Sequence, residues 1–524
     1  MNQQTLNTVF IASIVALGGF LMGFDASVIS GAVKFIEIEF DLSKIELGWS
    51  VASLAFAATF AMMVAGPLSD RLGRKPVLKY AAILFLVSAV LSALAPSFLI
   101  LIVARMIGGL GVGAALIVAP MYIAEISPPD IRGRMVSINQ LNIVVGISVA
   151  FFINYLILKL GQSDAGWVLS LHMDEWNWRW MLGLESLPAL LYFFCLWLVP
   201  ESPRWLVMKD RDNEALAVMT KFNPPALAEV QVAEIRSSVE QTSTGESSKL
   251  ADLFKKPMRL VLVIGITVAI LQQITGINSV FFYAPMIFEQ SGIGTDASYM
   301  QAILVGLTNL VFTLLAIALI DKIGRKTLLG VGVSGIAICM FILAYGFNSA
   351  TYTLDRESIQ QLPANIDRAQ LQQIENKTFN SDLSYRVALT DSLGKKALKE
   401  NESLLISSSI SINPTLILAG ILGFVASFAI SIGPVMWVLF SELFPNRIRA
   451  VAISFVGFIN SGVSFLVQLI FPWELSTFGN AGTFLIYGLF AVVGLVIIMK
   501  TLPETKGQSL ENLEQILVKR PGSA

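Results

Sequence analysis

The sequence predicts an all-α membrane protein with twelve transmembrane helices in two six-helix repeats. Of its 524 residues, 55% are hydrophobic and only 14% are charged, a balance too apolar for a soluble chain of this length. Apolar runs of about 20 residues, the length that crosses a bilayer, can be counted twelve times along the chain. Short polar motifs that follow three spans of the first half return after the matching spans of the second half, which indicates an internal repeat.

The apolar runs form two sets of six. The first set lies at roughly 8–30, 46–68, 77–95, 98–124, 136–158 and 179–199. The second set lies at roughly 259–289, 298–320, 327–347, 413–441, 450–471 and 482–501. We therefore expect an N-terminal half at 1–202, a cytoplasmic helical linker at 203–257, a C-terminal half at 258–505 with a polar extracytoplasmic insertion at about 348–411, and a cytoplasmic tail at 506–524.

The composition argues against several classes of function. The net charge of −1 suggests no nucleic-acid partner. With two cysteines in apolar runs and a single histidine, we expect no metal site, no cofactor and no catalytic triad, so an enzyme is disfavoured. The N-terminus lacks a basic region and a cleavage site, so we expect the first apolar run to be retained as a span.

Basic residues predict the orientation. They concentrate in the short loops after spans 2, 4, 8 and 10 and are missing from the loops after spans 3, 7 and 11. Because basic loops stay on the cytoplasmic side, we expect both termini and the linker to be cytoplasmic and the insertion to face outward. The expected location is the plasma (inner) membrane.

Span 7 holds an unusual polar stretch. Gln272, Gln273 and Asn278 lie within seven residues of one apolar run, and Gly276 and Pro285 mark points where the helix can unwind or bend. Such a broken, amide-rich helix is typical of a lining for an uncharged ligand with many hydroxyl groups. The alternative is a polar contact that only holds helices together.

Motifs at the span ends identify a family. Asp70-Arg-Leu-Gly-Arg-Lys after span 2 matches Asp321-Lys-Ile-Gly-Arg-Lys after span 8, and Pro200-Glu-Ser-Pro-Arg after span 6 is echoed by Pro503-Glu-Thr-Lys after span 12. Together with Gln272-Gln-Ile-Thr-Gly-Ile-Asn, these motifs make the chain resemble the sugar porters of the major facilitator superfamily, over nearly its whole length except the insertion. The resemblance implies the major facilitator fold and a sugar site between the halves.

The resemblance also assigns a site. At matching positions, sugar porters hydrogen-bond and stack on the sugar, which here implies Gln140, Gln272, Gln273, Asn278, Asn309, Trp437 and Asn460 as substrate-binding residues. Alone, each of them is as compatible with a helix contact as with a sugar ligand. We expect gating roles for Tyr283, Pro285, Gly433 and Pro434. Two positions depart from many family members: Ser461 stands where they carry tryptophan, and Ala429 where some carry glutamate.

A carboxylate inside span 1 suggests proton coupling. Placing Asp25 at the middle of a span costs about 2.5–3.5 kcal/mol on insertion scales, so a functional role is expected. Arg105 in span 4 is the expected partner. Proton-coupled sugar porters resemble this chain at both positions, whereas facilitators usually have a neutral residue in place of the aspartate. Our hypothesis is that protonation of Asp25 releases Arg105; the alternative is a static ion pair.

Further charges recur at the cytoplasmic span ends. We expect ion pairs there that hold span ends together in the outward-open state, with Glu201 and Arg204 anchoring the linker helices. The members of this expected network are Asp70, Arg74, Glu125, Arg132, Glu201, Arg204, Asp321, Arg325, Glu442 and Arg449.

The sequence therefore predicts a secondary active transporter that imports a monosaccharide, a hexose or a pentose, by proton symport through alternating access. Its expected partners are the sugar, the proton and the lipid bilayer, and we expect it to function as a monomer. The alternatives are a facilitative uniporter for a sugar or a polyol such as inositol and, less favoured, a sugar sensor that does not transport.

Overall fold

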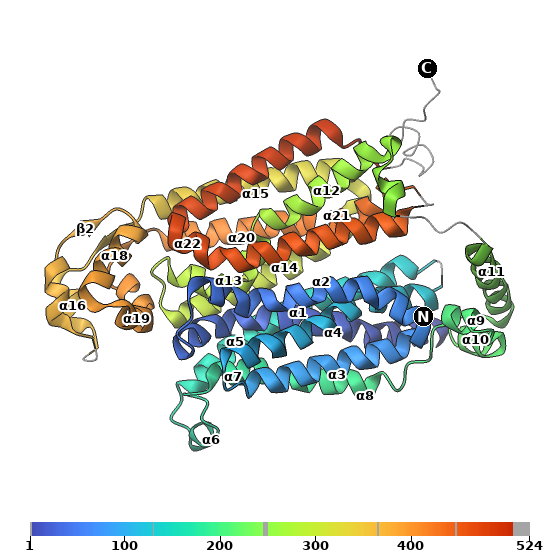
Figure 1. Ribbon diagram of the computed structural model, residues 1–524, viewed down its shortest axis with the longest axis horizontal. Coiled ribbons are helices and arrows are strands. Elements are labelled where there is room, and N and C mark those ends of the chain that lie inside the picture. Colours follow the sequence, from blue (N-terminus) through green and yellow to red (C-terminus); the bar gives the residue numbers. More distant parts are fainter. Residues whose placement is uncertain (1–2, 129, 245–249, 364–365, 446–447, 507–524) are drawn as a thin grey trace.

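Two helical bundles lie side by side along the long axis of the molecule (Figure 1). The computed structural model describes the chain except residues 1–2, 129, 245–249, 364–365, 446–447 and 507–524; the side chains of 241–244, 321 and 450 are also not described. The predicted tail at 506–524 thus lies almost wholly outside the described residues. The linker (203–257) and the insertion (348–411) occupy opposite ends of the bundles, called here the linker end and the insertion end.

The first bundle is built from long helices that pack closely. Its elements are α1 (Gln3–Glu39), α2 (Lys44–Leu72), α3 (Arg74–Ala93), α4 (Phe98–Ile126), α5 (Arg132–Gly161), α6 (Gly166–Ser170), α7 (Asn177–Gly183) and α8 (Ser186–Cys195). Helix α2 starts with a capping box in which Ser43 and Glu46 bond each other's backbone N–H groups. Helices α1 and α5 cross where Gly23 faces the carbonyl of Ile143, only 2.0 Å from where a Cβ of Gly23 would lie. A side chain there would therefore force the helices apart.

The second bundle repeats this plan with two interrupted helices. Its elements are α12 (Arg259–Ile274), α13 (Ile277–Glu289), α14 (Thr295–Ile323), α15 (Arg325–Asn348), α20 (Pro414–Ile430), α21 (Ile432–Leu443) and α22 (Arg449–Thr501). The linker, which connects the two bundles in the sequence, forms α9 (Pro203–Met208), α10 (Asp212–Met219), α11 (Pro225–Thr244), η1 (Leu250–Phe254) and η2 (Lys256–Met258).

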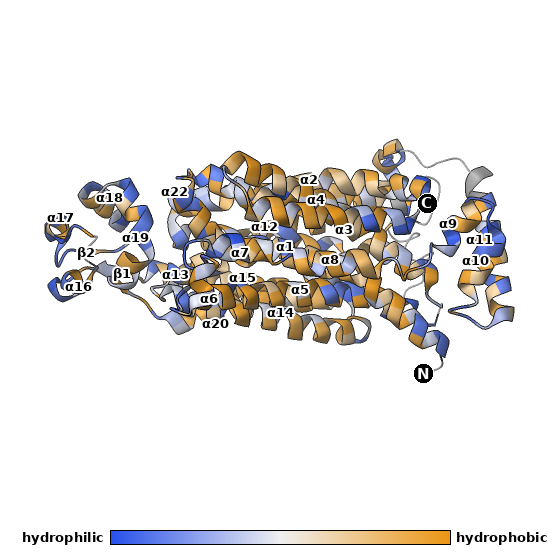
Figure 2. Ribbon diagram, turned by 90° about the horizontal axis from the view of Figure 1, so that it is seen from below, coloured by the Kyte–Doolittle hydropathy of each residue, from blue (hydrophilic) through white to orange (hydrophobic). Residues whose placement is uncertain are grey.

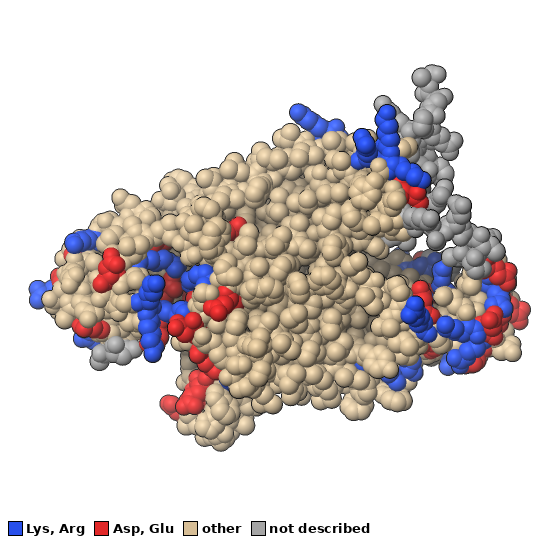
Figure 3. Space-filling model, viewed as in Figure 1, with Lys and Arg blue, Asp and Glu red and all other residues tan. Residues whose placement is uncertain are grey.

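The described helices are consistent with twelve spans. Ten helical segments are long and apolar enough to cross a membrane, with α12–α13 and α20–α21 each counted as one segment. Helix α22 is long enough for two spans and bends at Gly479, which has φ +69°. The short helices α7 and α8 follow one another over the predicted sixth run. The chain is an integral multi-pass membrane protein, with an apolar middle and charged residues gathered mostly at the two ends (Figures 2 and 3).

The insertion folds into a small unit with its own core, a structure for which the sequence carried no prediction. It contains β1 (Thr351–Thr353), α16 (Arg356–Gln361), α17 (Arg368–Leu371), η3 (Gln372–Ile374), β2 (Thr378–Phe379), α18 (Asp382–Leu393), α19 (Lys395–Ser407) and β3 (Ile410–Ser411). The strands form an antiparallel sheet in the order β2-β1-β3. Tyr352 stacks on Tyr385 in the core, and Asp382 accepts hydrogen bonds from the backbone and side-chain N–H groups of Asn480 in α22. The unit is thus docked on the second bundle.

Candidate functional site

A cavity of about 290 Å³ lies between the two bundles. Helices α1, α2, α4 and α5 of the first bundle line it together with helices of the second. Gly433 and Pro434 line this cavity. So do all seven residues assigned to substrate binding, which are Gln140, Gln272, Gln273, Asn278, Asn309, Trp437 and Asn460. The structure therefore brings together residues that are more than 300 positions apart in the sequence.

The amides of the second bundle form a connected network on one wall of the cavity. The side chain of Asn460 donates to Oε1 of Gln272 at 2.8 Å, and its Oδ1 accepts from Nε2 of Gln273 at 3.2 Å. Asn278 donates to Oε1 of Gln273 at 2.7 Å. Gln272 also donates to the carbonyl of Gly433 at 3.2 Å, at the start of α21. The network fixes these amides in position beside the cavity. It also joins helices to one another, as the alternative of a polar contact that holds helices together expects.

Two lining amides differ from this network. The side-chain amides of Gln140 on α5 and Asn309 on α14 make no hydrogen bond within the part of the chain that the structure describes, although both residues line the cavity. Each side-chain amide can both donate and accept, without a charge that must lose its hydration. Beside them, the exposed ring of Trp437 offers an apolar face. Such a surface suits a ligand that has hydroxyl groups and C–H faces.

The predicted interruption of span 7 is present. Helix α12 ends at Ile274 and α13 begins at Ile277, with Gly276 between them at φ +87°. A second departure from helical geometry occurs at Tyr283, two residues before Pro285, at φ −124° and ψ 17°. The first break separates the Gln272–Gln273 pair from Asn278 and lets all three amides meet in one network.

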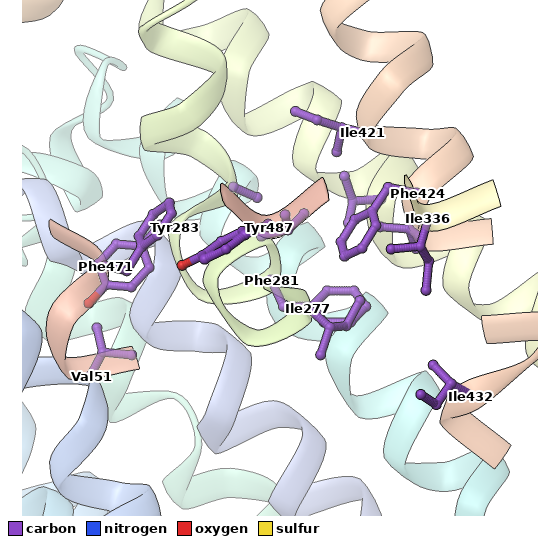
Figure 4. Packing of buried hydrophobic residues seen from close by; sticks show 14 of the residues in the cluster. Val51, Ile277, Phe281, Tyr283, Ile336, Ile421, Phe424, Ile432, Phe471 and Tyr487 are labelled. Carbon is purple, nitrogen blue, oxygen red and sulfur yellow. The ribbon is translucent and has the colours of Figure 1, made fainter. Parts of the chain in front are cut away.

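Tyr283 and Pro285 do not line the cavity, although we predicted them as part of a gate or the site edge. Tyr283 is fully buried, packs on Phe471 with ring centroids 5.1 Å apart, and donates to the carbonyl of Gln468 at 3.1 Å. Figure 4 shows Tyr283, Phe471 and Tyr487 side by side. Tyr283 thus lies behind the cavity wall and joins α13 to α22, both of which line the cavity.

Several lining residues were missing from the sequence-based set. They are polar or aromatic groups close to the predicted ones, and include Ser27, Phe281, Phe282, Thr313, Ser464 and Gln468. Ser464 and Gln468 follow Asn460 at four-residue spacing, which was the signal that could have identified them. The two departures from the family pattern, Ala429 and Ser461, also line the cavity.

Asp25 and Arg105 form a buried ion pair in the first bundle. The carboxylate of Asp25 is fully buried, and Arg105 is 1% exposed. Glu185, between α7 and α8, is 2% exposed and interacts electrostatically with both. Glu185 was not among the residues predicted from the sequence, although an acidic residue inside the sixth apolar run carried the same signal as Asp25. The site therefore holds two carboxyl groups for one guanidinium group.

Charged residues at the linker end form a pair of similar clusters, one in each bundle. In the first bundle, Arg74 makes a bidentate pair with Glu125 at 3.0 Å and contacts Asp70 at 2.9 Å. In the second, Arg325 pairs with Glu442 at 2.9 Å. The side chain of Asp321 lies outside the described residues. Each pair joins helices of the same bundle, so it stabilises the bundle itself.

Four members of the expected charge network have other surroundings. Arg132 and Arg449 donate to backbone carbonyls, those of Ser127 and Phe444, and among the described residues neither pairs with a carboxylate. Arg204 is exposed at the start of α9. Glu201 accepts from the backbone N–H groups of Arg74 and Lys75 at 3.0 and 3.2 Å, and so caps α3 just before the linker begins.

The cap on α3 has a counterpart on α15. Glu504 accepts from the backbone N–H of Arg325 at 2.9 Å and of Thr327 at 3.4 Å. Burial by itself raises the pKa of Glu504, but the N–H groups of Lys506, Arg325 and Thr327 outweigh it and hold the pKa below its ordinary value. The two proline-glutamate motifs therefore share one physical task, which is to cap the helix that follows a glycine turn.

The two bundles contact each other toward the insertion end. Lys34 on α1 pairs with Glu289 on α13 at 2.9 Å, and Lys399 of the insertion pairs with Asp41 at 2.8 Å. Deeper in, Phe465 of α22 packs on Trp49 of α2 with ring centroids 5.4 Å apart. These contacts close the molecule between the cavity and the insertion.

Comparisons with known proteins agree with this architecture. A family model described as "Sugar (and other) transporter" matches residues 11–361 and 396–517. The chain is 33% identical to an arabinose-proton symporter of Bacillus subtilis, covering 98% of this chain and 95% of the relative. It is also 33% identical to a glucose transport protein of Synechocystis, covering 98% of both. The inward open conformation of the xylose transporter XylE from E. coli superposes with a TM-score of 0.72 at 32% identity, over 97% of this chain and 99% of that one.

Proposed function

The chain belongs to the sugar porter family of the major facilitator superfamily, and we propose that it imports a monosaccharide together with a proton by alternating access. In this mechanism two bundles rock around one site, so that the site opens to one side of the membrane at a time. The protein is a transporter and not an enzyme. The coupling to protons is supported by the arabinose-proton relative.

The observation that carries the proposal is the uncharged, amide-rich cavity between the bundles. We propose that Gln140 and Asn309 bind sugar hydroxyl groups directly, because their amides have no other partner in the described part of the chain. Gln272, Gln273, Asn278 and Asn460 present a wall that is already held in place. Preorganised polar groups reduce the entropy lost when the sugar binds. Trp437 covers an apolar face of the ring.

Proton coupling is assigned to the buried pair of Asp25 and Arg105. Protonation of Asp25 removes its charge and weakens its attraction to Arg105, so the packing of α1 against α4 can change. Glu185 is buried near enough to interact electrostatically with Arg105, and we propose that its carboxyl group becomes the partner of Arg105 once Asp25 is protonated. A guanidinium group that always has a charged partner avoids the cost of an unpaired buried charge, and this makes the exchange physically feasible.

The gate is assigned to α13 and to the start of α21. We propose that the segment from Gly276 to Pro285 bends to close the insertion side over the sugar, while Gly433 and Pro434 move with Gln272. The cross-bundle contacts at the insertion end and the similarity to an inward open relative support a conformation open toward the linker end.

The basic loops support a plasma (inner) membrane orientation with cytoplasmic termini and linker and an outward-facing insertion. The halves at 1–202 and 258–505 are then the two moving units, and one chain contains the complete site, which supports a functional monomer in the lipid bilayer.

The test is uptake of labelled sugars and polyols by the purified protein in proteoliposomes. We expect accumulation against a sugar gradient when the outside is acidic, and its loss after a protonophore is added. Equilibration without accumulation under a pH gradient would show a uniporter instead. Binding without any uptake would favour the sugar sensor.

A further inference from the structure

A stripe of polar residues on α22 extends the amide network toward the insertion end. Asn460, Ser464 and Gln468 follow one another at four-residue spacing, so their side chains share one face of the helix. All three line the cavity, and all three are more than nine-tenths buried. A buried glutamine in a membrane helix is costly unless its polar atoms are used.

Gln468 uses only part of its hydrogen-bonding capacity. Its Nε2 donates to Oγ of Ser464 at 2.8 Å, and that hydroxyl group also accepts from Asn278 at 2.6 Å. Gln468 is thereby two hydrogen bonds away from the central amide network. Its side-chain oxygen accepts no hydrogen bond in the part of the chain that the structure describes, and the residue borders the cavity. A hydroxyl group of a ligand in the cavity can donate a hydrogen bond to this oxygen.

The packing around Gln468 fixes its location at the border of the cavity. It lies on the α22 turn that meets α2, between Phe465, which packs on Trp49, and Leu469, whose carbonyl lies against Gly48. Gln468 therefore borders the cavity on the side that is closed toward the insertion. Elsewhere in the lining, Ser461 and Ala429 have small side chains and leave room for a substituent on the sugar ring.

We propose that Gln468 is a specificity-determining residue that hydrogen-bonds a hydroxyl group at the insertion end of the substrate and so favours hexoses and cyclic polyols over pentoses. The inference rests on the proposed sugar transport and names its substrate class. A pentopyranose has a bare CH₂ at the ring position where a hexopyranose carries a hydroxymethyl group and a cyclic polyol a hydroxyl group. Only the latter two offer a polar group at that corner, while the other ring hydroxyls are common to all three. With this corner of the ring facing Gln468 in the proposed complex, the free acceptor of Gln468 discriminates between them.

The experiment compares sugars that differ at this one group. We would measure KM for uptake of D-glucose, 6-deoxy-D-glucose, myo-inositol and D-xylose in proteoliposomes, for the unaltered protein and for Gln468→Leu. The unaltered protein should prefer glucose or inositol to xylose and 6-deoxyglucose. Gln468→Leu should raise KM for the preferred substrate about three- to tenfold, the usual effect of one lost hydrogen bond, and leave KM for xylose within about twofold.

Two further variants make the outcome decisive. Gln468→Asn keeps an amide on a shorter side chain and should retain part of the preference for glucose or inositol over xylose. This variant keeps the proposal testable if Gln468→Leu does not fold. Asn154→Leu removes a buried amide of α5 that bonds the carbonyl of Val28 outside the cavity, and should affect all sugars alike. Equal changes for glucose and xylose in Gln468→Leu, or an unaltered protein that prefers xylose, would overturn the role of Gln468 alone. If the unaltered protein transports none of these sugars, the proposed function fails as well.

Discussion

Gly276→Ala tests whether the break in span 7 is required to build the site. Gly276 has φ +87°, a conformation that costs an L-residue about 1–2 kcal/mol. In addition, a Cβ at this position would lie 2.4 Å from Cδ2 of the Tyr487 ring. Tyr487 is held by a hydrogen bond to Glu474 at 2.7 Å and by packing on Phe471, so the ring cannot shift freely. Overpacking of this kind adds about 1–3 kcal/mol.

Gly394, which lies in the insertion, provides a control for backbone cost without a clash at the site. It also has a positive φ, +80°, with ψ at 161°, and no atom lies within 4 Å of the position that a Cβ would occupy. We expect Gly394→Ala to lower the thermal unfolding midpoint of the detergent-purified protein through its backbone cost alone and to leave KM for sugar unchanged, whereas Gly276→Ala should lower the midpoint and also raise KM for sugar. If Gly276→Ala kept a normal KM for sugar, the reasoning about Tyr487 and the break would be refuted.

Three other predictions concern coupling, the insertion and a helix cap. Gly108→Ala would place a Cβ 2.5 Å from Oγ of Ser88 and 2.8 Å from Oδ2 of Asp25, so we expect it to disturb the Asp25 pair and to reduce pH-driven accumulation more than sugar exchange. Equal effects on both assays would argue against the effect of this substitution on Asp25. Lys399→Ala removes the ion pair that lowers the pKa of Asp41 and ties the insertion to the first bundle, so the outward-open state should become more populated. Labelling of cysteine reporters at the insertion end measures this population, and unchanged labelling would contradict the prediction. Because Glu504 has a lowered pKa in the folded protein, its cap stabilises α15 at neutral pH, and this stabilisation is lost as the pH falls through the lowered pKa. Glu504→Gln should therefore lower the thermal unfolding midpoint at pH 7 and make that midpoint depend less on acid pH. An unchanged acid dependence would contradict the cap.

Much of the fold could be predicted because the bilayer imposes a length on each span. The apolar runs marked the positions of the spans, and Gly276 marked the break, since glycine tolerates a left-handed backbone. The small fold of the insertion could not be predicted in the same way. Its strands are two or three residues long, and its core depends on contacts such as Tyr352 on Tyr385, which are 33 positions apart.

The candidate site was predictable where polar residues interrupt apolar runs. Gln272, Gln273 and Asn460 stood out for this reason, and the structure joins them across 187 positions in the case of Gln273 and Asn460. Glu185 and Gln468 carried the same signal, but their importance depends on partners from other helices. Arg132 and Arg449 were predicted as members of ion pairs but donate to backbone carbonyls. An arginine at a span end can donate to a backbone carbonyl as readily as it pairs with a carboxylate, and the sequence does not distinguish the two.

The most direct test of the central claim is the effect of Asp25→Asn on two assays with the same proteoliposomes. Sugar counterflow needs only the cavity and the rocking of the bundles, whereas accumulation under an acidic-outside pH gradient also needs a group that carries the proton. We predict that Asp25→Asn keeps counterflow and loses accumulation. Undiminished uphill uptake in this variant would contradict the assignment of proton coupling to Asp25 and Arg105.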